Sequence, residues 1–76
     1  METSARVTSP EDLGRLAREV RKRQGLTQAE VAAACGTGTR FISEFERGKP
    51  TCRVGEVLHV LRMLGIELRA RGPDGR

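Results

Sequence analysis

The sequence has few of the residues that brace a small domain. Its 76 residues include two cysteines, one histidine, no tryptophan and no tyrosine. A disulfide is not expected, because Cys35 lies in an alanine-rich run and the N-terminus does not resemble a secretory signal. A structural zinc site needs four closely spaced ligands, whereas Cys35, Cys52 and His59 are three. Chains of this size bury only about 60% of their unfolded surface, so we expect oligomerisation to reinforce the fold.

Catalytic and membrane-spanning patterns are missing as well. The sequence has no paired carboxylates, no phosphate-cradling glycine loop and no nucleophile beside a base, so we expect neither an enzyme nor a cofactor. Cys52 has no adjacent base to activate it. His59 lies among apolar residues without a supporting carboxylate or cysteine, which favours a place at a polar edge or in a dimer interface. No apolar run approaches the ~20 residues that cross a bilayer, which favours a cytoplasmic protein.

What the sequence does have is basic charge. Fourteen lysines and arginines against ten acidic residues give a net charge of +4, and the isoelectric point is near 10. Twelve of the fourteen are arginines, whose guanidinium fork suits both guanine edges and phosphates. Genomic base bias produces the same enrichment, and many small domains are mildly basic. The charge therefore indicates a polyanionic partner without establishing one.

Apolar periodicity and capping residues predict two helices in the first half of the chain. Ser9 and Pro10 form a typical helix start, and apolar residues at helical spacing predict a first helix from about Pro10 to Gln24. Thr27-Gln28-Ala29-Glu30 is a capping box that begins a second helix, which Gly36 ends.

Two further helices are expected after a turn of about three residues. The third carries Ile42 and Phe45 inward and ends at Gly48; Gly38 before it is a weak cap, and Thr37 is the alternative cap. Thr51 is expected to cap a fourth helix that ends at Gly65. Its predicted apolar stripe consists of Val54, Val57, Leu58, Leu61 and Leu64.

The segment after Gly65 is patterned as a β-strand. Residues 66–71 alternate apolar and polar, with Ile66, Leu68 and Ala70 on one side. Since no second strand is predicted, the simplest pairing partner is the same strand of a second copy. We therefore expect an all-α fold of four to five short helices over residues 9–72 with a C-terminal strand that pairs across a homodimer. Residues 1–8 are expected to be a flexible arm and residues 73–76 a polar tail.

The second and third helices together have the pattern of a helix-turn-helix. Ala32 is small enough for a steep helix crossing, Gly36 accepts a left-handed turn, and Ile42 with Phe45 anchors the third helix. The segment TQAEVAAACGTGTRFISEFERGK resembles the Cro/C1-type (XRE) helix-turn-helix family, which has the lambda repressor-like fold. The flanking segments SPEDLGRLAREVRKRQGLTQ and KPTCRVGEVLHVLRMLGIELRAR resemble HipB-type antitoxins, so the resemblance covers about residues 9–71. In HipB-type antitoxins, the C-terminal strand pairs with the same strand of the dimer mate.

The resemblance also implies site residues. The base-reading candidates lie on the recognition helix and are Thr39, Arg40, Ser43 and Glu44. Arg40 is the first candidate for guanine, since a bidentate contact gives about 1–3 kcal/mol of discrimination; Glu44 is either an acceptor for a cytosine amino group or a solvated charge. Phe41 either packs on the helix flank or contacts a thymine methyl group. Backbone phosphates are expected to contact Thr27, Gln28, Arg47, Lys49 and Arg53. A structural ion pair is implied between Arg21 and Glu46.

These expectations combine into one predicted function. Family members repress their own operon, and HipB-type members also bind a HipA-type serine/threonine kinase toxin. The resemblance therefore implies a cytoplasmic, nucleoid-associated homodimer that binds palindromic double-stranded operator DNA as an autoregulatory type II antitoxin. Two alternatives remain: a stand-alone Cro-like or restriction-modification controller without a toxin, and a module that mainly binds a kinase toxin.

Overall fold

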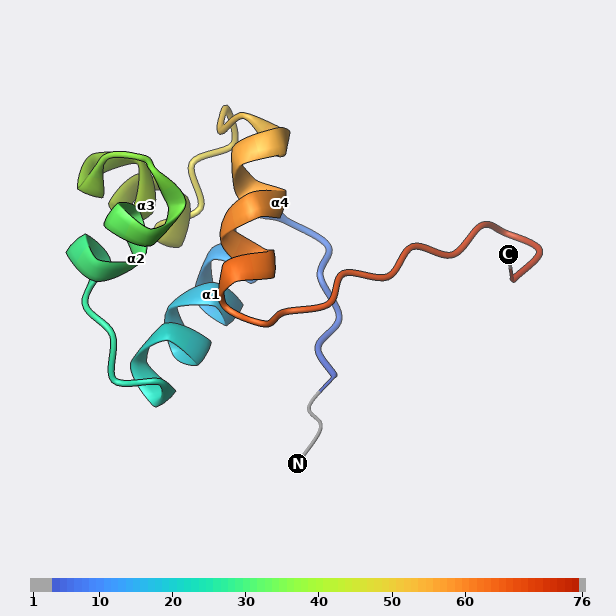
Figure 1. Cartoon of the computed structure of the whole chain (residues 1–76). Helices are drawn as coiled ribbons and strands as arrows, with labels where there is room; N and C mark the ends of the chain where they lie inside the picture. Colours follow the sequence, from blue (N-terminus) through green and yellow to red (C-terminus); the bar gives the residue numbers. More distant parts are fainter. Residues whose placement is uncertain (1–3, 76) are drawn as a thin grey trace.

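A computed structural model of the protein describes residues 4–75. Between these residues the chain forms four helices: α1 (Pro10–Arg23), α2 (Gln28–Cys35), α3 (Thr39–Glu46) and α4 (Val54–Met63). Figure 1 shows α2 and α3 side by side at one end of the molecule, with α1 below them and α4 against them. None of the helices in this part of the chain is long and apolar enough to span a membrane. The helical part of the predicted fold class is confirmed.

The starts of α1 and α2 are set by side-chain caps, as the sequence predicts. The Asp12 backbone N–H donates to Ser9 Oγ at 3.1 Å, and Pro10 occupies the first helical position. At α2, the Glu30 N–H donates to Thr27 Oγ1 at 3.0 Å while the Thr27 N–H donates to Glu30 Oε1 at 2.8 Å. Each bond satisfies an amide that lacks a partner within its helix, so both starts are fixed locally.

The turn between α2 and α3 depends on glycine. Gly36 ends α2 with φ +70°, a left-handed conformation that costs glycine no Cβ strain. Of the two caps considered for α3, the structure uses Gly38, and no side chain between residues 4 and 75 caps its first turn. Helix α3 is thus held mainly by packing.

The fourth helix differs from the prediction in two ways. It begins at Val54 with Arg53 as its cap, and not after Thr51, and its first backbone bond runs from the Val57 N–H to the Arg53 carbonyl at 3.0 Å. Its buried face also contains Val60, whereas Val54 and Leu58 are 71% and 41% exposed. Val57, Leu61 and Leu64 belong to both the predicted apolar stripe and the buried one, because both stripes have helical spacing. Packing against the other helices buries the stripe that contains Val60.

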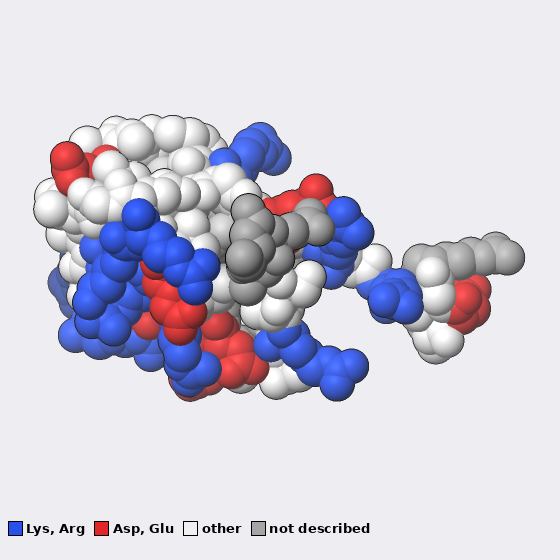
Figure 2. Space-filling model, turned by 90° about the horizontal axis from the view of Figure 1, so that it is seen from below, with Lys and Arg blue, Asp and Glu red and all other residues white. Residues whose placement is uncertain are grey.

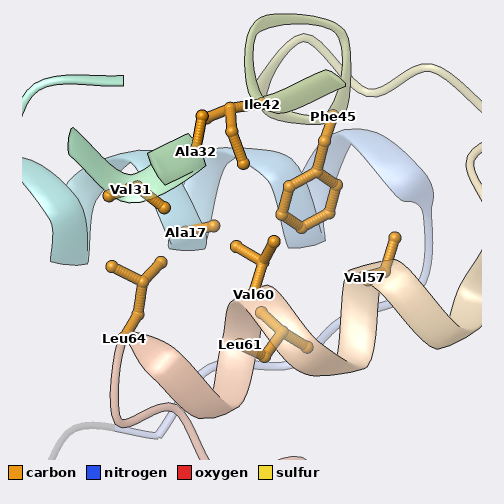
Figure 3. Close-up of a cluster of buried hydrophobic side chains, with 9 residues drawn as sticks. All are labelled: Ala17, Val31, Ala32, Ile42, Phe45, Val57, Val60, Leu61 and Leu64. Atoms are coloured by element: carbon orange, nitrogen blue, oxygen red, sulfur yellow. The ribbon is translucent and has the colours of Figure 1, made fainter. Parts of the chain in front are cut away.

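The core is one cluster to which all four helices contribute. Figure 3 shows Ile42 and Phe45 projecting from α3 toward α4, with Ala17 of α1 between the helices. The cluster consists of Ala17, Val31, Ala32, Ile42, Phe45, Val57, Val60, Leu61 and Leu64. Gly14 lets α1 approach α3 closely, since a Cβ there would lie 2.3 Å from the Phe45 carbonyl oxygen. These contacts fix which side of α3 faces inward.

The predicted C-terminal strand is not formed within one copy of the chain. Ile66 packs against the core, but residues 67–71 are exposed and lead away from the helices in Figure 1. A strand needs a hydrogen-bonded neighbour, and the segment of residues 4–75 provides none. Pairing across a homodimer therefore remains a proposal, taken up below.

The N-terminal segment is partly tied to α1. Of the arm predicted over residues 1–8, residues 4–8 have no regular secondary structure, while residues 1–3 lie outside the described residues, as does residue 76 of the predicted tail. Thr8 donates from both its backbone N–H and its hydroxyl to Asp12 Oδ2, each at 3.0 Å. These bonds help to lower the pKa of the Asp12 carboxyl group, with the Thr8 backbone bond as the largest cause.

Candidate nucleic-acid interface

The inner side of α3 is locked by an ion pair as well as by the core. Arg21 Nε donates to Glu46 Oε2 at 2.6 Å, and Arg21 Nη2 donates to Glu46 Oε1 at 3.0 Å. A third donor, Arg21 Nη1, bonds to the Leu26 carbonyl at 2.8 Å. The side chains of Arg21 and Glu46 are only 9% and 3% exposed. The pair implied by the family resemblance thus joins α1, the loop after it and the end of α3.

Gln28 extends this pair to the start of α2. Its Nε2 donates to Glu46 Oε1 at 3.0 Å. Burial raises the pKa of Glu46, but the hydrogen bonds from Arg21 and Gln28 outweigh it, so the net pKa lies below the usual value. The hydrogen bond from Glu46 also raises the pKa of Arg21. Both members are therefore charged at neutral pH, and one N–H of the Gln28 side chain, an expected phosphate contact, is used inside the protein.

The outer side of α3 gathers the four predicted base-reading residues. Thr39 and Arg40 are exposed, Ser43 and Glu44 are half-buried, and Ile42, Phe45 and Glu46 on the other side are buried. The Arg40 side chain is 89% exposed. Residues at this spacing share one helical face. The structure therefore presents Thr39, Arg40, Ser43 and Glu44 as one polar surface directed away from the core.

Glu44 links Arg40 on this surface to Lys49 beside it. Arg40 Nε donates to Glu44 Oε2 at 3.2 Å, and Lys49 Nζ donates to Glu44 Oε1 at 3.0 Å. The hydrogen bond from Lys49, followed by that from Arg40, holds the pKa of Glu44 below its usual value. The four-residue spacing of Arg40 and Glu44 signals their contact in the sequence, but the sequence analysis did not identify it.

The expected phosphate contacts lie around the ends of the helices. Arg47 is exposed, and Lys49 is 45% exposed beside a shallow hollow of about 360 Å³ that Glu44, Arg47, Gly48, Lys49 and Pro50 line. Arg53 at the start of α4 is 85% exposed, with Nη1 3.8 Å from Glu56 Oε1. Thr27 is exposed at the start of α2, although its hydroxyl serves the cap. Arg47 and Lys49 are adjacent to the outer surface of α3.

Comparison with known proteins decides the family. The family model described as "Helix-turn-helix domain" matches residues 2–71. The chain belongs to this family. It is also 46% identical over 71 residues, 93% of each chain, to the "Uncharacterized HTH-type transcriptional regulator y4mF" of Sinorhizobium fredii (strain NBRC 101917 / NGR234).

Solved structures place this helix-turn-helix protein more narrowly. The structure described as "HipB(S29A)-O2 20mer complex" matches with a TM-score of 0.84 and 25% identity over 93% of this chain and 99% of that one. "Structure of HipA-HipB-O2-O3 complex" matches with a TM-score of 0.83 and 24% identity over 92% and 99%, a likeness of fold. Together with the family match and the curated relative, the first of these structures confirms the predicted XRE-type, HipB-like resemblance.

The two phenylalanines of the helix-turn-helix pack on one another. The rings of Phe41 and Phe45 are stacked with centroids 6.3 Å apart and planes 16° apart. Phe41 is half-buried and lies against the core. Of the two interpretations of Phe41, this geometry supports packing on the flank of the helix.

Positive charge on this helix-turn-helix protein extends beyond α3. Viewed from below, Figure 2 shows lysine and arginine side chains gathered on one part of the visible face, with acidic side chains between them. On α1, which lies low in Figure 1, the exposed basic residues are Arg15, Arg18, Lys22 and Arg23. Net charge alone therefore does not locate the interface, and the outer surface of α3 is distinguished by its geometry.

The two cysteines and the histidine lie away from the polar residues of the outer surface in sequence, and their surroundings differ. Cys35 and Cys52 are free thiols packed against the core, and burial raises the pKa of both. Cys35 of α2 and the exposed His59 of α4 both line a cleft of about 220 Å³. Within residues 4–75, no group of three or more histidine, cysteine or acidic side chains is placed to hold a metal ion.

Proposed function

We propose that this protein is a sequence-specific, DNA-binding transcriptional repressor whose helix α3 enters the major groove. The observation that carries the proposal is the division of α3 into two sides. Ile42, Phe45 and Glu46 fix its inner side, while the Arg40 side chain on its outer side is 89% exposed. A short helix held in this way presents a fixed polar surface, which is how the second helix of a helix-turn-helix reads bases.

The proposed contacts divide into base reading and positioning. Arg40 is proposed to bind O6 and N7 of a guanine through two parallel donors. Thr39 and Ser43 have short hydroxyl groups that bond to several bases, so they position the helix more than they specify a sequence. Phosphate contacts, which provide affinity without sequence preference, are proposed for Thr27, Gln28, Arg47, Lys49 and Arg53.

We propose that the active form is a homodimer. Within one chain, residues 67–71 have no regular secondary structure and lead away from the helices (Figure 1), and Leu68 is 50% exposed. Pairing of residues 66–71 with the same segment of a second copy satisfies its backbone groups and covers the apolar side formed by Ile66, Leu68 and Ala70. A two-fold dimer then reads a palindromic operator with half-sites about one helical turn apart.

We further propose that the protein is an autoregulatory antitoxin of HipB type, located with the nucleoid in the cytoplasm. The likeness to HipB over nearly the whole of both chains supports this proposal. The partner is a kinase of HipA type, encoded by a neighbouring reading frame. Co-expression of the two gene products followed by size-exclusion chromatography tests it. A stable complex is expected, and a protein that elutes alone contradicts the antitoxin role while leaving DNA binding intact.

A binding assay on the protein's own upstream region tests the main proposal. Fluorescence anisotropy at a stated moderate salt concentration compares this duplex with a shuffled duplex of the same composition. Specific binding is expected to be at least about 1,000-fold tighter than nonspecific binding. Equal affinity for the two duplexes contradicts a sequence-specific repressor.

A further inference from the structure

Glu44 occupies an unusual place for an acidic residue on a surface proposed to face DNA. Its two carboxylate oxygens accept from two different basic residues, Arg40 Nε at 3.2 Å and Lys49 Nζ at 3.0 Å. The Arg40 and Lys49 side chains are 89% and 45% exposed, whereas that of Glu44 is 23% exposed. The carboxylate therefore lies beneath two cations that extend further into solvent.

The turn after α3 holds this arrangement in place. Gly48 adopts φ +88°, and the Lys49 backbone N–H donates to the Glu44 carbonyl at 3.1 Å. The main chain thus returns Lys49 to the residue that its side chain also contacts. Lys49 therefore bonds to Glu44 through both its side chain and its backbone, and these bonds hold the Glu44 carboxylate in place beside Arg40.

The contact with Arg40 uses the inner edge of the guanidinium group. Glu44 binds Nε, the donor nearest the helix, so the two terminal amino groups remain at the outer end of the side chain. Bidentate recognition of guanine needs two parallel N–H donors in a fixed orientation. An arginine held at Nε loses less conformational freedom when it binds a base, because part of its freedom is already lost in the free protein.

We propose that Glu44 is a positioning residue for specificity: it orients Arg40 toward a guanine and, by its negative charge, weakens binding to DNA that lacks this guanine. The inference rests on the proposed DNA-binding function and assigns Glu44 a role through Arg40, where the sequence left a cytosine contact or a solvated charge as alternatives. Nonspecific affinity depends on the number of phosphates that cations neutralise. A carboxylate bound to Arg40 and Lys49 reduces their attraction to phosphates on DNA of any sequence. Its orienting effect on Arg40 strengthens binding only where the guanine is present.

The experiment uses a duplex that the wild-type protein selects from a randomised library, together with a shuffled duplex and one in which the selected guanine is replaced. The variants are Glu44→Ala, Glu44→Gln and, as a matched loss of one negative charge on the exposed face of α1, Glu19→Gln. Thermal unfolding followed by circular dichroism verifies that each variant is folded. Anisotropy titrations over a range of salt concentrations give the affinities and the salt slopes.

Glu44→Ala is expected to lower the preference for guanine about ten-fold and to strengthen binding to the shuffled duplex severalfold, with a steeper salt dependence. Glu44→Gln removes the same negative charge, so it is expected to strengthen nonspecific binding similarly. It retains an oxygen acceptor for Arg40 Nε and is therefore expected to keep most of the guanine preference. Glu19→Gln is expected to leave the guanine preference unchanged. Unaltered guanine preference in Glu44→Ala overturns the inference.

A double-mutant comparison shows whether Glu44 acts through Arg40. In an Arg40→Ala background, Glu44→Ala is expected to cause no further loss of guanine preference. An equal loss in both backgrounds shows that Glu44 reads a base itself, which overturns the positioning role. If the wild-type protein selects no motif, the DNA-binding proposal fails; a motif that Glu44→Ala reads as well as wild type refutes the positioning role alone.

Discussion

Helices α3 and α4 bury one side each in the same core, but their outer sides differ. The outer side of α3 is polar and carries the highly exposed Arg40 in its first turn. On α4, exposed apolar side chains lie at Val54, Leu58 and Met63, which are 71%, 41% and 47% exposed. A polar, basic surface suits nucleic acid, whereas a cluster of exposed apolar side chains indicates a protein contact. The two helices therefore share an amphipathic pattern, and only their outer residues distinguish them.

The inner sides differ in their dependence on polar bonds. Helix α3 is only eight residues long, and isolated helices of this length are marginal in water. Its end is joined to α1 by the buried pair of Arg21 and Glu46, while α4 buries three apolar residues in the core, followed by Leu64 at its C-cap. We therefore expect α3 to respond to the loss of a buried charge as well as to the loss of apolar contacts.

The largest predicted effect is on the buried ion pair. Glu46→Ala is expected to lower the free energy of unfolding by about 3–5 kcal/mol, because it leaves the Arg21 guanidinium buried without its counterion. Urea denaturation followed by circular dichroism measures the change. The control is Glu67→Ala, which removes an exposed ion pair with Arg69 and is expected to cost less than about 1 kcal/mol. Equal costs for the two variants contradict a structural role for the buried pair.

The next prediction compares the inner side of α3 with the outer side of α4. Ile42→Ala removes a side chain that is 1% exposed and is expected to cost about 2–5 kcal/mol. Val54→Ala removes one that is 71% exposed, so its cost in the monomer is expected to stay below about 0.5 kcal/mol. Denaturation at a concentration where the protein is monomeric provides both values. A large loss of unfolding free energy in Val54→Ala would show that the apolar stripe containing Val54 is buried.

How far the sequence predicts this structure depends on the range of the interactions. The starts of α1 and α2 follow from local caps, Ser9 and the Thr27 capping box, so the sequence analysis located them. The prediction of the buried face of α4 is wrong because two overlapping apolar stripes fit its periodicity, and only packing against other helices determines which one is buried. The contact between Glu44 and Lys49 depends on the turn at Gly48, and the proposed strand depends on a second copy. Neither feature is encoded in the local pattern that reveals helices.

A third prediction concerns the proposed dimer. Leu68→Lys places a charge on the apolar side of residues 66–71 and is expected to weaken dimerisation by about 2 kcal/mol, or about 30-fold in the dissociation constant. Analytical ultracentrifugation measures the monomer-dimer equilibrium. Glu67→Gln is the control, because it also adds one unit of positive charge and period-two alternation places residue 67 on the opposite side of the strand. The same shift in both variants argues against strand pairing in this register.

A fourth prediction concerns the outer side of α3. Arg40→Ala is expected to lower discrimination between specific and shuffled duplexes at least ten-fold, about 1.4 kcal/mol, with a change of about one or less in the salt slope. Arg62→Ala removes the same charge from the exposed side of α4 and is expected to leave discrimination unchanged. Anisotropy titrations at several salt concentrations separate the two effects. Loss of discrimination in Arg62→Ala instead places the DNA on α4.

The smallest expected effect is a change in the pH dependence of stability. The pKa of Glu46 in the folded protein is lowered: burial raises it, but the hydrogen bonds from Arg21 and Gln28 prevail. A depressed native pKa stabilises the fold above the pKa of the unfolded chain, and this contribution is lost as the pH falls through the native pKa. Wild-type stability should therefore decrease from about pH 6 to about pH 3.

Glu46→Gln separates this contribution from those of Asp12 and Glu44, whose carboxyl groups also have lowered pKa values. Glutamine has nearly the same shape and can accept a hydrogen bond from Arg21, but it does not titrate. The variant should be less stable than wild type at neutral pH, and the gap should narrow as the pH falls, because protonation removes the charge of Glu46 in wild type. A gap that stays constant over this range shows that Glu46 does not titrate with folding. The inner side of α3 would then depend on the shape of this side chain and not on its charge.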